Sequence, residues 1–240
     1  MLRFIFNLIA LILMIAINAL ANILPLNGQT TGEVSNKLDV LFTPAGYVFS
    51  IWGLIYFLLG IWVLRGLPKH RRNAALYTTT SGLFVLSSLL NSLWIFLWHY
   101  EYIIWTVVVM VLLLLTLIRL YGKVKAARPS FWDQLPFSIY LGWVSVATIA
   151  NISYALVYYG WDGFGLSAVT WTIIMLLVAA WLSLFFRSKE NDWVYPLVFV
   201  WAFIGIGVRT MEKEPMVAYT AYGLAFVIFI GIFLLRKKQD

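Results

Sequence analysis

Eight long runs of apolar residues follow one another along this chain of 240 residues, separated by short polar segments. Each run is long enough to cross a bilayer as a helix, for which roughly 20 apolar residues are needed. None alternates between apolar and polar positions as a membrane β-strand does, and a helix satisfies its backbone groups internally in lipid. The pattern predicts an all-α membrane protein, a polytopic bundle of about eight transmembrane helices at residues 4–24, 46–64, 74–98, 101–121, 134–158, 167–186, 192–209 and 216–235.

The loops between these runs alternate in charge, which predicts the orientation of the chain. Of the 17 lysines and arginines, all but Lys37, Arg209 and Lys213 fall on the side that also holds both termini. Cytoplasmic loops of membrane proteins carry the excess of basic residues, so we expect both termini in the cytoplasm and a multi-pass position in the cell membrane, in a pattern typical of bacteria. The net charge of +7 therefore indicates orientation and contact with membrane lipid, and we expect no nucleic-acid partner.

Two features lie near the first run. Residues 19–21 read Ala-Leu-Ala, which resembles the cleavage site of a secretory signal. The run is long for the core of a signal, so we expect an uncleaved first helix, and cleavage is the alternative. The segment 25–45 that follows is the longest loop and lies on the predicted outer side. Connections of this length are commonly lids or binding segments, and a plain solvated loop is the alternative.

Ionisable groups are missing from the middle of every predicted span, which weighs against several functions. Ion-coupled transporters and proton pumps usually keep such groups at that depth. The chain has no cysteine, and its two histidines, His70 and His99, fall in loops on opposite sides. We therefore expect no catalytic residues, no metal site and no cofactor, and an enzyme is not the expected class.

The spans carry aromatic and amide side chains instead. Trp98, Trp105, Trp132, Trp161 and Trp193 fall at span ends, which is typical of an interfacial belt; Trp52, Trp94, Trp143, Trp171, Trp181 and Trp201 fall deeper. Side chains three or four positions apart share a helix face. Such faces in three spans predict a lined cavity for a planar, hydrophobic ligand, and hydrogen bonding between helices alone is the alternative. The predicted ligand-binding residues are Trp52, Tyr56, Asn91, Trp94, Trp143, Ala147 and Asn151.

Three stretches of the sequence resemble the tryptophan-rich sensory protein/translocator protein (TspO/MBR) family. They are LFTPAGYVFSIWGLIYFLLG at 41–60, SSLLNSLW at 87–94 and YLGWVSVATIAN at 140–151, which keep family positions at Pro44, Trp52, Gly53, Tyr56, Gly60, Leu90, Asn91, Trp94, Tyr140, Leu141, Trp143, Ala147, Thr148 and Asn151. The chain departs from the family at Tyr47, Ser50, Ser92 and Ile139. The resemblance covers about 1–160, so we expect a five-helix bundle of this family there and three additional transmembrane helices at 161–240.

The resemblance implies binding of porphyrins and other flat hydrophobic ligands, with the first outer loop as a lid, and a link to sensory regulation. We therefore predict a non-catalytic binding or sensory protein whose partner is a hydrophobic small molecule such as a tetrapyrrole. A transporter or permease of a small apolar solute is one alternative. A membrane scaffold is another, because the pairs Gly53/Gly60, Gly205/Gly207 and Gly223/Gly231 would permit close packing against a partner or in a homodimer, or within one bundle.

Overall fold

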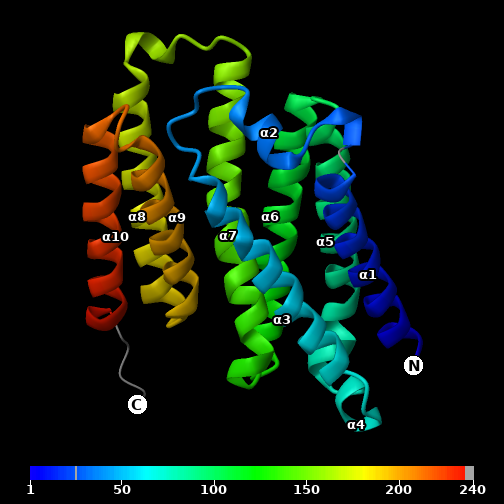
Figure 1. Ribbon diagram of the computed structural model, residues 1–240. Helices are drawn as coiled ribbons and strands as arrows, with labels where there is room; N and C mark the ends of the chain where they lie inside the picture. Colours follow the sequence, from blue (N-terminus) through cyan, green and yellow to red (C-terminus); the bar gives the residue numbers. More distant parts are fainter. Residues whose placement is uncertain (25, 236–240) are drawn as a thin grey trace. The chain divides into compact units, whose positions relative to one another are not determined.

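The computed structural model describes residues 1–24 and 26–235, and in that part of the chain all regular structure is helical (Figure 1). Seven helices are long and apolar enough to cross a membrane, and α9 is a shorter apolar helix. These confirm the predicted polytopic helical membrane bundle. The seven are α1 (Leu2–Ile23), α3 (Ile51–Arg65, counted with the helical turn Gly46–Ser50 before it), α5 (Ala75–His99), α6 (Ile103–Ala126), α7 (Phe131–Tyr158), α8 (Ala168–Glu190) and α10 (Pro215–Leu234). The shorter helix α9 is Val194–Thr210.

Five short helical segments lie in the connections between the long helices. They are η1 (Leu26–Gly28), α2 (Thr31–Asn36), η2 (Gly46–Ser50), α4 (Lys69–Arg72) and η3 (Gly163–Gly165). Three of them, η1, α2 and η2, fall within or next to the long outer loop, which therefore has structure of its own. The predicted span at 46–64 begins as η2 and continues directly into α3.

The ends of α8 and the start of α9 are determined by local side-chain and backbone interactions. The Ser167 hydroxyl accepts the backbone N–H of Thr170 at 3.1 Å and so caps the first turn of α8. Asn191 ends α8 in the left-handed conformation, with φ of 53°. The Asp192 carboxylate then accepts the backbone N–H of Val194 at 2.8 Å and caps α9.

The helices group into two compact units. The first consists of residues 1–37 and 51–144, and the second of residues 38–50 and 145–240. The long helix α7 supplies its first half to one unit and its second half to the other. The predicted division into a five-helix bundle at 1–160 and three further helices at 161–240 concerns family length, not compactness, and it stays a prediction.

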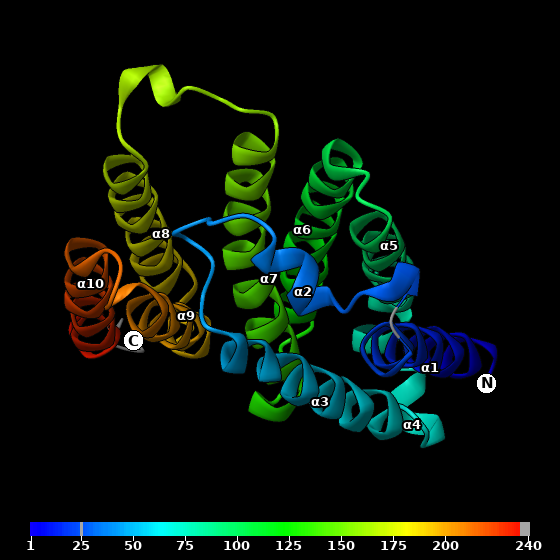
Figure 2. The same ribbon diagram turned by 45° about the horizontal axis from the view of Figure 1, so that its top comes forward.

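In the first unit, α5 packs against both α1 and α6 (Figure 2). Two hydrogen bonds join α1 to α5 inside the apolar interface: Asn7 Nδ2 donates to Ser81 Oγ at 3.1 Å, and Asn18 Nδ2 donates to Asn91 Oδ1 at 2.8 Å. All four side chains are buried. Because such groups find no partner in hydrocarbon, the two bonds set the position of α1 along α5.

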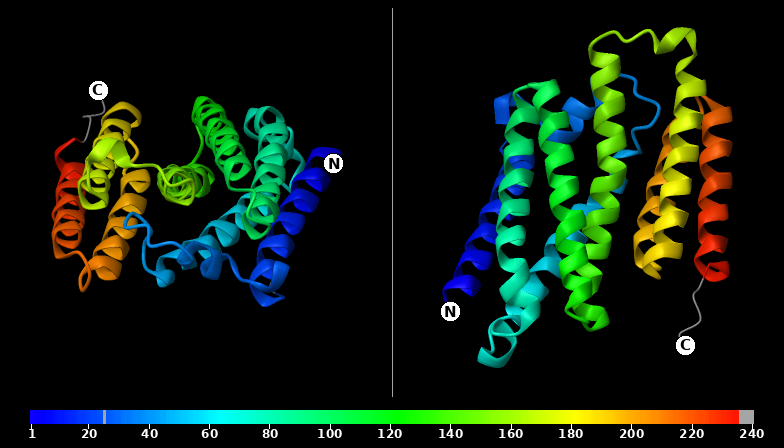
Figure 3. Two further views of the ribbon diagram at one scale, coloured as in Figure 1. Left: turned by 90° about the horizontal axis from the view of Figure 1, so that it is seen from above. Right: turned by 180° about the vertical axis from the view of Figure 1, so that it is seen from behind.

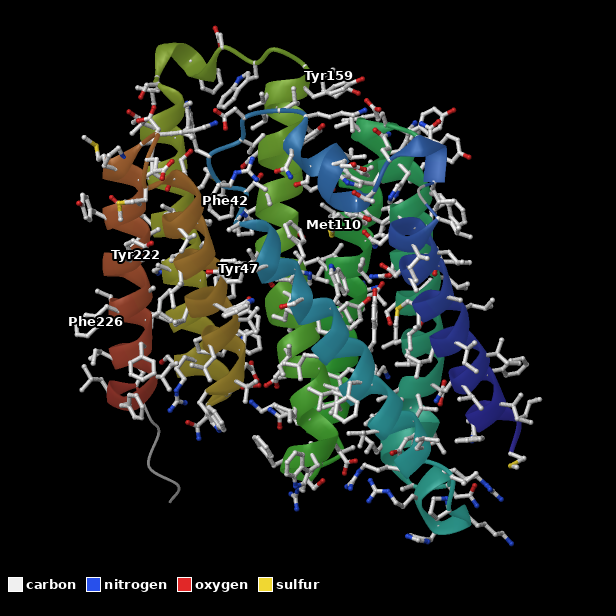
Figure 4. All side chains as sticks on the ribbon, viewed as in Figure 1. Phe42, Tyr47, Met110, Tyr159, Tyr222 and Phe226 are labelled. Carbon is white, nitrogen blue, oxygen red and sulfur yellow. The ribbon has the colours of Figure 1, made fainter. Side chains whose placement is uncertain are left out.

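In the second unit, α8, α9 and α10 pack against one another, as both views of Figure 3 show. Glycines make the close approaches possible. A Cβ added at Gly207 would lie 2.5 Å from the ring of Tyr222, which Figure 4 labels on α10, and one at Gly231 would lie 2.4 Å from Leu184. One at Gly205 would lie 2.1 Å from Val48, in the segment before α3.

These contacts separate the predicted glycine stripes into two kinds. Gly205, Gly207 and Gly231 lie against side chains of their own unit. These three therefore fit the alternative in which the glycines permit packing within one bundle. A Cβ at Gly53, Gly60 or Gly223 would meet no atom of the described chain within 4 Å. The same residue type therefore has different roles at different positions of the helices.

Substitution of Gly205 by alanine is expected to lower the free energy of unfolding by about 1–3 kcal/mol, because the added Cβ overlaps Val48. Equilibrium unfolding of the purified protein in mixed micelles measures the change. The matched control is Gly223→Ala, where the space is open and the gain in helix propensity is up to about 1 kcal/mol. Equal loss of stability in both variants would contradict this account of the packing.

Candidate ligand-binding site

Trp52 is the centre of an aromatic cluster in the first unit. Its ring stacks on that of Tyr56, one turn later in α3, with centroids 5.6 Å apart and planes 22° apart. Two rings of α7 meet it edge-on, Tyr140 at 6.0 Å and Trp143 at 6.1 Å. Three of the seven predicted residues, Trp52, Tyr56 and Trp143, are therefore brought together, with Tyr140 as a fourth member.

The cluster contains polar groups as well as ring faces. The Tyr56 hydroxyl is buried and makes no hydrogen bond within the described part of the chain. The Tyr140 hydroxyl is buried too, and it lies near Asn91 but outside ordinary hydrogen-bond geometry. A buried hydroxyl without a partner costs about 1–3 kcal/mol, so each one favours any bound molecule that offers an acceptor. The cluster thus combines stacking surfaces with two available donors.

Asn91 and Trp94 lie on α5, and both already have partners. Asn91 is 2% exposed, and its Oδ1 accepts the bond from Asn18 described above. Trp94 stacks on Trp98, with centroids 5.2 Å apart and planes 17° apart. The hydrogen bond of Asn91 to Asn18 fits the alternative given above, in which the amide side chains join helices and do not line a cavity.

The last two predicted residues, Ala147 and Asn151, follow Trp143 along α7 at intervals of four. This spacing places them on the same face of that helix, in the half that belongs to the second unit. Asn151 is buried, and Ala147 is partly exposed.

A second aromatic cluster in the first unit was missed by the sequence analysis. Trp62 is fully buried in α3, and its ring lies 4.8 Å from Tyr77, 5.1 Å from Phe84 and 5.0 Å from Phe137. The Tyr77 hydroxyl donates to the Trp62 carbonyl at 2.9 Å. This cluster joins α3, α5 and α7 in the core. Trp62 lies ten residues after Trp52, which is not a same-face spacing on an α-helix, so the i,i+4 pattern did not indicate it.

Two other tryptophans differ in exposure, which their position along a span did not predict. Trp98, predicted for the interfacial belt, is 4% exposed, and its Nε1 donates to the Thr31 carbonyl at 3.2 Å. Trp181, predicted to lie deeper, is 64% exposed and stacks on Phe185 of the same helix. Position along a span predicts depth in the membrane, but it does not show which way a helix face points.

The first part of the long outer loop is fastened to the turn between α5 and α6. The side chains of Asn27 and Gln29 each donate to the His99 carbonyl at 3.0 Å. Lys37 forms an ion pair with Glu101, which also accepts a bond from Gln29 at 3.2 Å. Residues 26–37 thus form a docked segment of the first unit, whereas residues 38–45 belong to the second unit.

Comparison with known proteins adds one match. A family described as TSPO-like protein matches residues 4–234, from α1 to α10. The match includes α8, α9 and α10, which lie beyond the three motifs noted in the sequence. No curated protein and no solved structure matches the chain.

The docking of residues 26–37 is expected to weaken in acid. Hydrogen bonds from Lys37 and Gln29 hold the pKa of Glu101 below its ordinary value. A carboxylate with a lowered pKa stabilises the docked form fully above the ordinary value of about 4.3, and this contribution is lost as the pH falls through the lower pKa. A spin label on Gly32→Cys, in a chain without other cysteines, should become more mobile below pH ~4.

The matched control carries the same label together with Glu101→Gln. This variant keeps the acceptor oxygen but has no carboxyl group to titrate, so its label should be mobile at neutral pH and change little in acid. Identical pH dependence in the two proteins would show that another group controls the segment.

Proposed function

The chain belongs to the TSPO-like protein family, and from this premise we propose that it is a non-catalytic membrane binding protein for a flat hydrophobic ligand of the porphyrin kind. The observation that supports the proposal best is the set of rings around Trp52, with two buried hydroxyls lacking hydrogen bonds beside it. Pockets for small molecules are mostly apolar and aromatic, with a few polar groups that orient the ligand.

The chemistry of a porphyrin suits this cluster. Its macrocycle offers a large apolar face to the indoles of Trp52 and Trp143, and its carboxylates and ring nitrogens offer acceptors to the hydroxyls of Tyr56 and Tyr140. Stacked and edge-on aromatic pairs contribute roughly 0.5–1.5 kcal/mol each beyond the area that they bury. Trp94 and Asn91 would border the ligand from α5.

The docked segment 26–37 would act as the lid. It holds its place through a few polar contacts at the α5–α6 turn, the ion pair of Lys37 with Glu101 among them. Ion pairs at such exposed positions contribute about 0–1 kcal/mol each, so the segment can open without unfolding the unit. A ligand that changes the docking of this segment would alter the outer surface of the protein, which is what a sensory role requires.

Removal of a central ring should weaken ligand binding strongly. In a titration of the purified protein with protoporphyrin IX, we expect saturable quenching of tryptophan fluorescence. Trp143→Ala should raise the dissociation constant by about 30-fold, the effect of losing roughly 2 kcal/mol at a buried aromatic contact.

The matched control is Trp181→Ala, which removes an indole that is 64% exposed and outside the cluster. Its dissociation constant should match that of the unaltered protein. Equal weakening in both variants, or no saturable quenching at all, would overturn the proposed site. Preserved helical circular dichroism in each variant excludes misfolding as the cause.

A further inference from the structure

A cavity lies wholly within the second unit. Its volume is about 250 Å³, and its walls come from the second half of α7, the turn around η3, the start of α8 and residues 39–42. In Figure 4, Phe42 marks the segment that contributes to the wall, and Tyr159 marks the end of α7. None of the predicted ligand-binding residues lines it.

Two tryptophans form one wall of this cavity. The rings of Trp161 and Trp171 lie 4.9 Å apart at an angle of 54°. Trp171 Nε1 donates to the Gly163 carbonyl at 2.6 Å, which fixes its ring against the turn. Gly163 has a φ of 67°, and a Cβ there would lie 3.0 Å from that same Nε1. The turn therefore needs glycine at this position, and it holds the two indoles in a set geometry.

The rim of the cavity carries two carboxylates, and they differ in their partners. Asp39 Oδ2 is paired with Lys213 Nζ at 3.1 Å. Asp162 Oδ1 accepts the backbone N–H of Phe164 at 3.0 Å, and within the described residues Asp162 forms no ion pair. A carboxylate without a paired cation attracts positive charge. The faces of the two indole rings add to this attraction, because the ring quadrupole makes them negative.

The rest of the wall is mostly apolar, because the hydroxyls of Ser153 and Thr172 that also line it donate to the backbone of their own helices. Leu156, Val157 and Leu166 line the cavity together with Met175 of α8. These side chains suit a hydrocarbon or aromatic group, whereas a hydrated metal ion or a sugar would find few partners among them. The cavity is also small, below the roughly 300–1,000 Å³ that pockets for drug-sized molecules usually have.

We propose that this cavity is a binding site for a small lipophilic organic cation, such as a quaternary ammonium with an apolar group. The ammonium lies against Trp161 and Trp171 and is neutralised by Asp162, while the apolar group fills the pocket between α7 and α8. Quaternary ammonium groups are commonly recognised by aromatic rings in this way. The occupant is a free small molecule, because the volume suits a compact cation better than a whole lipid.

Binding of benzyltrimethylammonium tests the proposal directly. The protein is placed in nanodiscs of phosphatidylethanolamine and phosphatidylglycerol, which contain no choline headgroup, and titrated by calorimetry. The comparison ligand is neopentylbenzene, in which a carbon replaces the charged nitrogen and the shape is unchanged. We expect the cation to bind at least about fivefold more tightly than this neutral ligand.

Variants separate the site from general attraction to the membrane surface. Asp162→Asn keeps the oxygen that caps the turn and removes the charge, so it should weaken the cation about fivefold and leave the neutral ligand unchanged. Glu212→Gln, an exposed carboxylate that does not line the cavity, is the matched control and should change neither. Equal affinities for the two ligands, or equal effects of the two variants, would overturn the proposal.

A final comparison identifies the source of the cation. Replacing half of the lipid by phosphatidylcholine should leave the affinity for benzyltrimethylammonium unchanged. Competition by that lipid would overturn the assignment to a free molecule and assign the cavity to a choline headgroup.

Discussion

Lipid offers no hydrogen bonds, and every polar group that this chain carries into its long helices must therefore find a partner inside the protein. The requirement is met along most of the first unit. Asn18 donates a hydrogen bond to Asn91 across the interface of α1 and α5, and Asn7 donates one to Ser81 nearer the start of both helices. The buried hydroxyls of Tyr56 and Tyr140 lack such bonds in the described chain, as a few other buried polar atoms do, and these two belong to the same cluster around Trp52. The same constraint that positions the helices thus indicates where a ligand would be stabilised.

The two proposed binding sites use different chemistry. The cluster around Trp52 offers flat rings and hydroxyl donors, which suit a planar molecule with acceptor atoms. The cavity beside Trp161 and Trp171 offers ring faces and a carboxylate, which suit a compact cation. Each site lies within one of the two units, so each can be tested by substitutions that leave the other unit unaltered.

Much of the fold could be predicted from the sequence, because hydropathy reports directly on which segments lipid accepts. Each of the eight predicted spans corresponds to a helix, of which seven are long enough to cross a membrane and α9 is shorter. The i,i+4 spacing of Trp52 and Tyr56 predicted that they share a helix face, and their rings stack there. Whether a given tryptophan side chain faces the interior or the outside of the bundle was harder to predict. Trp181 is exposed on α8, whereas Trp98 is buried and its Nε1 donates to the Thr31 carbonyl, and position along a span indicates neither.

Contacts between segments that are distant in the sequence could not be predicted from it, for a physical reason. The cluster around Trp62 depends on how α3, α5 and α7 meet, and no periodicity within one helix encodes that meeting. The cavity beside Trp171 likewise forms only when residues 39–42 reach α7 and α8. The resemblance covered about residues 1–160, whereas the family match spans residues 4–234 and so includes the last three helices.

The central claim is that a flat ligand contacts the rings of Trp52 and Trp143, and fluorine NMR of protein labelled with fluorotryptophan tests it most directly. Each resonance is assigned by replacing one tryptophan with phenylalanine, and protoporphyrin IX is then added to the protein in nanodiscs. The ring current of the macrocycle should shift the resonances of Trp52 and Trp143 strongly and leave that of Trp181 in place. Shifts confined to exposed tryptophans, with Trp52 and Trp143 unchanged, would contradict the account.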